Sequence, residues 1–217
     1  MDASNSLISV EDALDQILQQ IVPLAGEQVP LPRSFGRILA EDIISTIQVP
    51  PFANSAMDGY AIIATNSQRA SPENPVRLKV VENIPAGETP TKSITGQTAA
   101  RIMTGAPMPG GADAVIRFEE TSEHVATDTE PAGEVRLFSA VKPGDNVRLA
   151  GEDIQEGQTI LKSGHRLHPQ DVGVLAAVGQ AHVPVLRRPR IAILATGDEL
   201  VSIDESVSPG IIRNSNE

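Results

Sequence analysis

Near the N-terminus, apolar residues recur at the spacing of one face of a helix. Ser9 can cap the first turn, and Glu11 and Asp12 follow it, as is typical of a helix start. The apolar positions at intervals of three and four residues are Val10, Ala13, Leu14, Ile17, Leu18 and Ile21. Pro23 interrupts this pattern, because proline cannot continue a helix. The sequence therefore predicts an amphipathic helix between residues 9 and 23.

From residue 60 to residue 142 the pattern changes to short apolar runs separated by Gly, Pro, Asn and Thr. Such runs predict strands beginning at Tyr60 and at 76–81, 99–104, 113–120 and 134–140, bounded by turn-forming residues. We expect a small β barrel or sandwich here. Turn clusters at 141–146 and 151–157 indicate that the chain then changes domain.

The last part of the chain contains two further elements. Pro169 at a helix first turn, an apolar run and Gly179 as a stop predict a short helix, following the usual placement of proline and glycine. Residues 190–196 are almost continuously apolar and end in a polar glycine turn, which is typical of the first strand of a parallel α/β sheet. The end at 214–217 resembles a helix N-cap, so we expect the chain to end inside a further domain.

The composition of the chain argues against several classes of binding partner. The chain has 217 residues, a net charge of -11, no cysteine and only 2% aromatic residues. This acidity and the lack of stacking platforms argue against nucleic acid as a partner, and against an anionic membrane surface. No apolar run approaches the roughly 20 residues that span a bilayer, and no signal peptide is visible. We expect a cytoplasmic protein without disulfides or thiolate metal sites.

The segment 54–60 is the first candidate site. It places Asn54, Ser55 and Asp58 around Gly59 and before Tyr60, the only tyrosine. Pro50 and Pro51 stiffen its entry, and glycine can adopt positive φ. Asp58 would then lie at a rigid junction between a loop and a strand. The alternative is that these polar side chains only tie a turn together.

A second candidate is the segment 101–113, in which a predicted strand ends at Thr104 and a Gly- and Pro-rich loop follows. Its backbone amides, the Thr104 hydroxyl and Arg101 could bind an oxyanion or phosphate, since such loops expose N–H groups. The alternative is a plain connector between two strands. The loop is not a P-loop, because no Gly-Lys-Ser/Thr follows.

Two acidic segments complete the candidates. Glu152 and Asp153 lie in an extended segment, where neighbouring side chains point to opposite faces, and a surface ion pair with Arg148 is the alternative reading. Asp198 and Glu199 follow the predicted strand, at the sheet edge where α/β folds bind ligands; a helix cap is the alternative for Asp198.

The candidate carboxylates also suggest a metal. Asp58, Asp153 and Glu199 would together suit Mg²⁺ and a phosphate-bearing substrate, because this ion prefers carboxylate oxygens and water. The histidines, which are His124, His165, His168 and His182, show no zinc-ligand spacing. We expect His165 and His168 on the surface.

Five segments in this order closely resemble the molybdopterin molybdenumtransferase family, which comprises the MoeA proteins and the gephyrin E domain. They are FGRILA at 35–40, NSAMDGYA at 54–61, RIMTGA at 101–106, GEDI at 151–154 and TGDEL at 196–200. Each segment is weak alone, but their shared order and spacing are specific, and the resemblance covers essentially the whole chain.

The resemblance implies a fold and a domain organisation. It implies an α+β multidomain protein, in which a discontinuous mixed α/β domain at 1–45 and 145–180 carries an inserted β-barrel-like domain at 46–144. Residues 181–217 would begin an incomplete α/β domain like that of the adenylyltransferase partner. Most of that domain and a C-terminal barrel are missing from this sequence, so we expect the fragment alone to be inactive.

The resemblance also implies a function. Family members insert molybdate into adenylylated molybdopterin in a Mg²⁺-dependent step of molybdenum cofactor biosynthesis, and they release AMP. By motif, Asp58, Asp153 and Glu199 would act in catalysis or metal binding, and Ser55, Thr104 and Asp198 in substrate binding. The implied partners are a second copy in a homodimer, the molybdopterin adenylyltransferase and molybdoenzyme maturation factors. In the family's dimer, Asp58 would act across the interface, on one wall of a composite site.

Two other functions stay open at this point. The chain could be a non-catalytic dimerisation or assembly module of the same family. It could instead be an unrelated β-rich sugar or oxyanion binder, although the low aromatic content disfavours sugar stacking.

Overall fold

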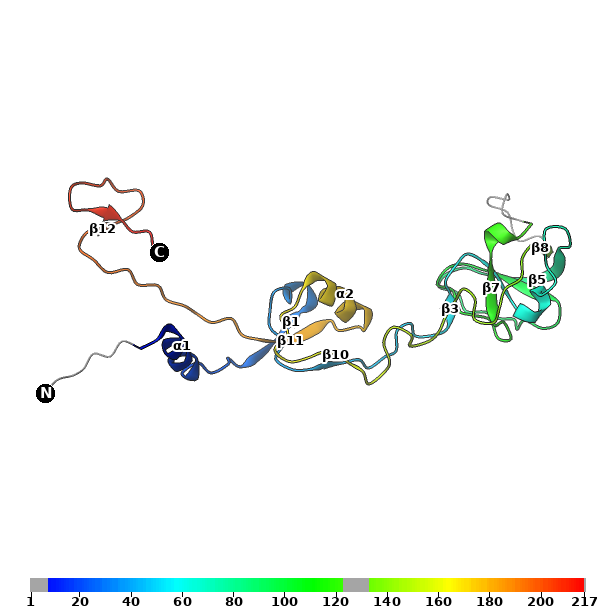
Figure 1. The fold of residues 1–217 in the computed structure, drawn as a ribbon, viewed down its shortest axis with the longest axis horizontal. Helices are drawn as coiled ribbons and strands as arrows, with labels where there is room; N and C mark the ends of the chain where they lie inside the picture. Colours follow the sequence, from blue (N-terminus) through cyan, green and yellow to red (C-terminus); the bar gives the residue numbers. More distant parts are fainter. Residues whose placement is uncertain (1–7, 123–132, 217) are drawn as a thin grey trace.

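The computed structural model describes residues 8–122 and 133–216 and shows an elongated molecule (Figure 1). A β-rich body lies at one end, and a smaller mixed body lies near the centre. The helices are α1 (Val10–Gln19) and α2 (Pro169–Ala177). The strands are β1 (Gly26–Pro30), β2 (Ile43–Ile44), β3 (Asn54–Ser55), β4 (Gly59–Ile62), β5 (Val76–Ile84), β6 (Thr98–Ile102), β7 (Ala114–Arg117), β8 (Glu134–Leu137), β9 (Val147–Arg148), β10 (Thr159–Leu161), β11 (His182–Leu186), β12 (Leu200–Val201) and β13 (Ile212–Arg213).

The β-rich body is a mixed half-barrel. Its five-stranded sheet has the order β7-β4-β6-β5-β8, in which only the β5–β6 pair is parallel. Successive residues of β4 point to opposite faces, so that Tyr60 and Ile62 enter one core while Ala61 enters another. Burial on both faces explains why this strand is continuously apolar. The four later predicted strands are confirmed, although 118–120 forms a short 3-10 helix (η3, Phe118–Glu120) instead of strand.

The central body is built from segments far apart in the sequence. Strand β1 pairs with β11, and β2 pairs with β10, both antiparallel. Apolar residues of these strands, of α2 and of the segments beside them form a third core, whose buried members are Leu39, Ile43, Leu167, Leu175, Val183 and Val185. The predicted helix at Pro169 is confirmed. Since β11 belongs to this core, the body extends past the predicted boundary at residue 180.

Two antiparallel stretches of chain connect these bodies (Figure 1). They hold together through the short β3–β9 ladder and an isolated bridge between Val49 and Ile154. The amide nitrogens of Asp153 and Ile154 both lie 3.0 Å from the Val49 oxygen. The chain therefore leaves the central body along one stretch and returns along the other, so the half-barrel is an insertion in the central body.

The predicted N-terminal helix is confirmed. The Ser9 hydroxyl accepts a hydrogen bond from the Asp12 amide at 3.0 Å, which satisfies one free N–H group of the first turn. No residue of α1 is buried, and Leu14, Ile17 and Leu18 are each more than half exposed. The helix therefore forms without a core to receive its apolar face.

The predicted strand at 190–196 is wrong. These residues are extended but unpaired, and Ile191 and Leu194 are 79% and 86% exposed. A strand requires a neighbour for its backbone groups, and the described chain offers none here. The tail instead forms a two-stranded parallel pair between β12 and β13. Asn214 accepts a bond from the Asn216 amide at 3.0 Å, so it closes a turn and no helix follows it within the described residues.

Candidate functional site

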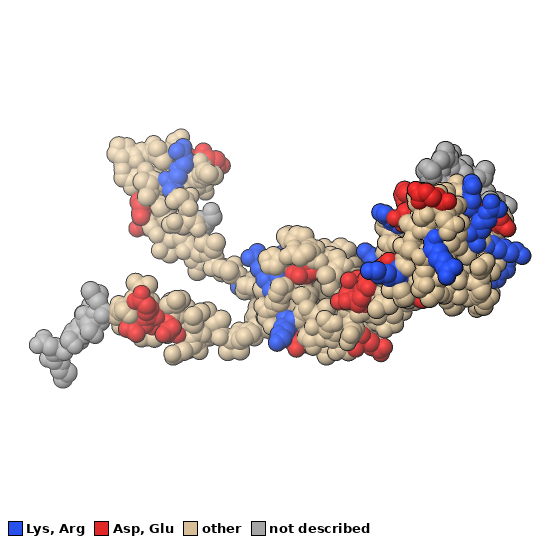
Figure 2. Space-filling view, turned by 45° about the vertical axis from the view of Figure 1, so that its right-hand side comes forward, with Lys and Arg blue, Asp and Glu red and all other residues tan. Residues whose placement is uncertain are grey.

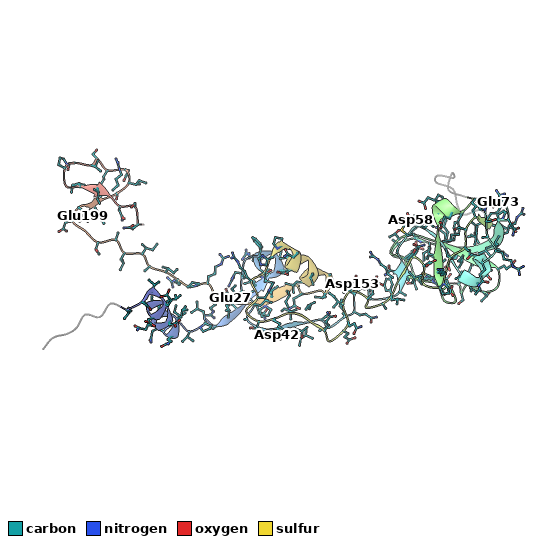
Figure 3. All side chains as sticks on the ribbon, in the orientation of Figure 1. Glu27, Asp42, Asp58, Glu73, Asp153 and Glu199 are labelled. Carbon is teal, nitrogen blue, oxygen red and sulfur yellow. The ribbon has the colours of Figure 1, made fainter. Side chains whose placement is uncertain are left out.

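The structure joins two of the predicted site residues. One carboxylate oxygen of Asp58, Oδ1, accepts hydrogen bonds from the Thr104 amide at 2.7 Å and from the Thr104 hydroxyl at 2.8 Å. Both residues are exposed at one end of the half-barrel, where Figure 3 labels Asp58. No other hydrogen bond to the carboxylate is found within residues 8–122 and 133–216, so Oδ2 is open to a ligand.

Backbone hydrogen bonds between two loops bring this pair together. The Ser55 amide donates to the Ala106 carbonyl at 3.0 Å, and the Gly105 amide donates to the Ser55 carbonyl at 2.8 Å. Gly105 has a φ of +82°, a conformation that glycine adopts without steric cost. These bonds align the loop before β4 with the loop after β6, so Thr104 lies opposite Asp58.

The same contacts fix the charge of Asp58. Hydrogen bonds from the Thr104 amide and hydroxyl lower the pKa of Asp58, and the nearby Arg101 acts in the same direction. Partial desolvation opposes them; it is weaker than the Thr104 hydrogen bonds but stronger than the Arg101 charge. Because hydrogen bonds to the ionised form favour that form, Asp58 is a carboxylate at neutral pH.

Gly59 is required for a reason other than the one predicted. Its φ lies outside the left-handed region, and it is the first residue of β4. A Cβ placed on Gly59 would lie 2.0 Å from the Ile116 carbonyl oxygen of β7. The glycine therefore permits the close approach of two backbones beside Asp58.

Asn54 and Ser55 form the buried strand β3, and their side chains bond the segments on either side of it. The Asn54 amide group donates to the Phe52 carbonyl at 3.1 Å, and the Ser55 hydroxyl donates to the Met57 carbonyl at 2.5 Å. Ser55 is fully buried and its hydroxyl bonds the following turn; its role in substrate binding stays a prediction. The turn-forming alternative therefore describes these two side chains, whereas Asp58 reaches across to another loop.

Asp153 lies on the connection between the two bodies and is exposed (Figure 3). Its neighbour Glu152 accepts a bond from the Leu149 amide at 2.8 Å and lies 4.0 Å from the Arg148 guanidinium. The ion-pair alternative thus describes Glu152. Asp153 is left facing solvent.

Asp198 and Glu199 lie in the turn before β12, and both are exposed. Figure 3 shows Asp58, Asp153 and Glu199 on three separate parts of the molecule. Within the described residues, no group of three or more His, Asp or Glu side chains could hold a metal ion. Mg²⁺ commonly uses one or two carboxylates together with substrate phosphates, so Asp58 alone could contribute one ligand. The three-carboxylate metal site stays a prediction.

Sequence reasoning missed the role of His165. Its Nε2 lies 2.8 Å from Asp171 Oδ2, and the same oxygen accepts the His168 amide at 2.7 Å at the start of α2. Burial alone would raise the pKa of Asp171, but these bonds lower it below its usual value. Half-buried His165 is therefore a structural partner, and only His168 is exposed as predicted. His124 lies outside the described residues.

Sequence reasoning also missed Phe118, the first residue of η3. The guanidinium carbon of Arg101 lies 5.7 Å from the centre of its ring, within the range of a cation–π contact. The only available signal was its single aromatic ring near the end of a predicted strand.

Among the helices that the structure describes, none has the length and apolarity needed to cross a membrane.

Fold and site together define an elongated α+β protein whose inserted mixed half-barrel presents an ionised aspartate at one end. Residues 8–179 match a family model described as "MoeA N-terminal region (domain I and II)". This match covers most of the chain, and the chain belongs to the MoeA N-terminal family.

Named relatives support this assignment. The chain is 41% identical over 209 residues to the molybdopterin molybdenumtransferase of Staphylococcus epidermidis, covering 96% of this chain and 48% of that protein. It is 40% identical over the same length to the Staphylococcus aureus protein of that name. The crystal structure of the molybdopterin biosynthesis moeA protein from Pyrococcus horikoshii OT3 matches with a TM-score of 0.83 at 36% identity, over 94% of this chain and 52% of that one. The chain thus spans about half the length of these relatives.

Proposed function

We propose that this chain supplies the N-terminal region of a molybdopterin molybdenumtransferase in molybdenum cofactor biosynthesis. The proposed reaction is the Mg²⁺-dependent insertion of molybdate into adenylylated molybdopterin with release of AMP. Membership of the MoeA family and relatives with this name at 40% to 41% identity support the proposal. The structural observation that carries it is the Asp58–Thr104 pair, because it presents an ionised carboxylate with one open oxygen.

Each residue of the proposed site has a chemical role. Thr104 occupies Oδ1 of Asp58 with two hydrogen bonds and so orients Oδ2 toward a ligand. An ionised carboxylate in this position can accept a proton or ligate a hard cation. A bound Mg²⁺ would supply charge neutralisation for phosphate and molybdate oxygens. Asp153 and Glu199 are the proposed further acidic groups, contributed by other parts of the assembled protein.

A hybrid protein tests this proposal. Residues 1–217 would replace the matching half of the Staphylococcus epidermidis protein, and molybdenum cofactor formation would be measured. We expect the hybrid to be active and Asp58→Asn to lower its rate by about 100-fold or more, the usual contribution of a positioned acid–base group. Asp15→Asn on the exposed face of α1 makes the same charge change and should leave the rate unchanged. An inactive hybrid that binds its substrates, or full activity of Asp58→Asn, would refute the proposal.

A second candidate function is a non-catalytic assembly module that forms a homodimer. The exposed apolar face of α1 favours it, since Leu14, Ile17 and Leu18 are 52%, 58% and 53% exposed and such faces usually mark contact surfaces. Light scattering of the 217-residue chain would test it. A dimer that dissociates on Ile17→Asp supports this candidate, and a strict monomer that joins no longer family member argues against it.

A further inference from the structure

Arg101 is the only half-buried cation among the described residues that lacks a carboxylate partner. Within residues 8–122 and 133–216, every lysine and arginine other than Arg37 and Arg101 is exposed. Arg37 is buried and forms an ion pair with Glu27. No described carboxylate forms such a pair with Arg101, although burying a charge is unfavourable unless a counter-charge accompanies it. A half-buried guanidinium without an internal anion is a candidate site for an external one.

An aromatic ring holds the Arg101 guanidinium in place. Its central carbon lies 5.7 Å from the centre of the Phe118 ring, and that ring packs against the first core of the half-barrel. The side-chain hydrogen bond of Arg101 is weak, because Nη1 lies 3.5 Å from Asn83 Oδ1, at the limit of such a bond. A cation–π contact uses the charge and not the N–H groups. Most N–H donors of Arg101 therefore have no acceptor in the described part of the chain.

The backbone amides beside Thr104 are already in use. The sequence suggested that they could bind an oxyanion, but the amides of residues 103–106 all donate within the protein. Their acceptors are the Ile84 carbonyl at 3.1 Å, the Asp58 carboxylate at 2.7 Å, the Ser55 carbonyl at 2.8 Å and the Met103 carbonyl at 3.0 Å. The Thr104 hydroxyl also donates to Asp58, at 2.8 Å. Of the donors that the sequence suggested at residues 101–106, Arg101 is the one that stays available.

Arg101 and the candidate site share one end of the half-barrel. Arg101 of β6 lies opposite Tyr60 of β4, which follows Asp58 and Gly59 in the sequence. The Phe118 amide donates to the Asp58 backbone carbonyl at 3.0 Å, while the Phe118 ring carries the guanidinium. An ion bound by Arg101 would therefore lie beside the Asp58–Thr104 pair.

We propose that Arg101 is the binding residue for a tetrahedral oxyanion beside Asp58. Its planar guanidinium fork can donate to two oxygens of such an ion and stays charged at every physiological pH. Partial burial strengthens the attraction, since less water screens it. The inference rests on the proposed function for the source of the ion, which is molybdate or a phosphate group of the adenylylated substrate. The nearby Asp58 carboxylate repels an anion, so we expect millimolar binding in the 217-residue chain.

The direct test is an NMR titration of the 217-residue chain with molybdate and, separately, with inorganic phosphate. Sodium chloride at equal ionic strength is the reference, because it reproduces the screening without the tetrahedral ion. We expect one or both ions to shift the amide signals around Arg101 and Phe118, and the more strongly bound ion identifies the source. Shifts that gather instead at the exposed basic segment 187–190, or no shift with either ion, would overturn the inference.

Three variants test the guanidinium itself. Arg101→Gln should weaken the binding by about 10-fold or more, since charge-assisted hydrogen bonds are lost. Arg77→Gln removes an exposed arginine of β5 and should bind the ion as the wild type does. Arg101→Lys keeps the charge without the fork, so its affinity should lie between the two. Equal affinities of Arg101→Gln and Arg77→Gln would contradict the inference, and the wild-type signal map decides the question even if Arg101→Gln does not fold.

The hybrid enzyme separates this inference from the proposed function. There, Arg101→Gln should raise the KM for molybdate or for adenylylated molybdopterin more than it lowers kcat, as the loss of a binding contact does. An inactive hybrid, together with Arg101-dependent ion binding in the 217-residue chain, refutes the proposed function alone. An active hybrid whose KM values and ion binding are the same in Arg101→Gln refutes the role of Arg101 alone.

Discussion

Gly59→Ala should destabilise the half-barrel strongly, because the new methyl group has no room. Its carbon would lie 2.0 Å from the Ile116 oxygen, 3.0 Å from the Ile116 carbonyl carbon and 3.1 Å from the Arg117 Cα. All three are backbone atoms, so no side chain can rotate away. A carbon–oxygen contact normally requires about 3.3 Å, and β4 and β7 would have to separate by about 1 Å.

The expected loss follows from that separation. Overpacking costs about 1–3 kcal/mol, and each ladder hydrogen bond that breaks costs about 1 kcal/mol. Alanine also restricts the unfolded chain, which stabilises the folded state by about 0.4–1 kcal/mol. This gain is too small to offset the loss. We expect a net loss of about 3 kcal/mol in the free energy of unfolding.

Tyr60 makes this prediction measurable. It is the only tyrosine, the chain has no tryptophan, and Tyr60 is fully buried next to Gly59. Its fluorescence during urea unfolding therefore reports the half-barrel and not the central body. Gly133→Ala is the matched control, because no described atom lies within 4 Å of its added Cβ, and it should change the free energy by less than about 0.5 kcal/mol. Equal urea midpoints for the two variants would refute the packing argument.

Two other predictions concern the central body and the tail. Asp171 has a lowered pKa, so its ionised carboxylate stabilises the fold at neutral pH, and this stabilisation is lost as pH falls through the pKa of the folded state. Amide exchange in α2 should therefore accelerate on acidification, and Asp171→Asn should abolish that pH dependence. Trypsin should cut after Arg190 before it cuts after Arg77, because 190–196 is extended and unpaired whereas Arg77 lies in β5; earlier cleavage at Arg77, located by mass spectrometry, would contradict this order.

The sequence pattern correctly predicted the two helices. The cap at Ser9 and the apolar repeat predicted α1, and Pro169 and Gly179 framed α2, because helical hydrogen bonds are made within the segment. The run at 190–196 shows where this reasoning fails. Its composition is typical of a buried strand, yet strand formation depends on neighbours that the pattern cannot show.

Some features of the candidate site could be predicted from the sequence, and others could not. Asp58 could be proposed from the sequence, because its segment combines turn residues with the start of a strand. Its bond to Thr104 joins positions 46 residues apart and depends on how two loops align. The roles of Gly59 and Ser55 also depend on packing, since Gly59 faces the Ile116 backbone and Ser55 is buried in β3 with its hydroxyl bonded to the Met57 carbonyl.

The spacing of the candidate carboxylates determines what a complete site requires. Asp58, Asp153 and Glu199 are each exposed and lie on the half-barrel, the connection and the tail (Figure 3). Lysine, arginine and acidic residues are interspersed over the face of the molecule that Figure 2 shows. A reaction that uses all of them therefore needs a second surface to close on Asp58. The apolar residues left exposed on α1 and at 191–194 are where such a surface can gain binding energy, because burying them removes apolar area from water.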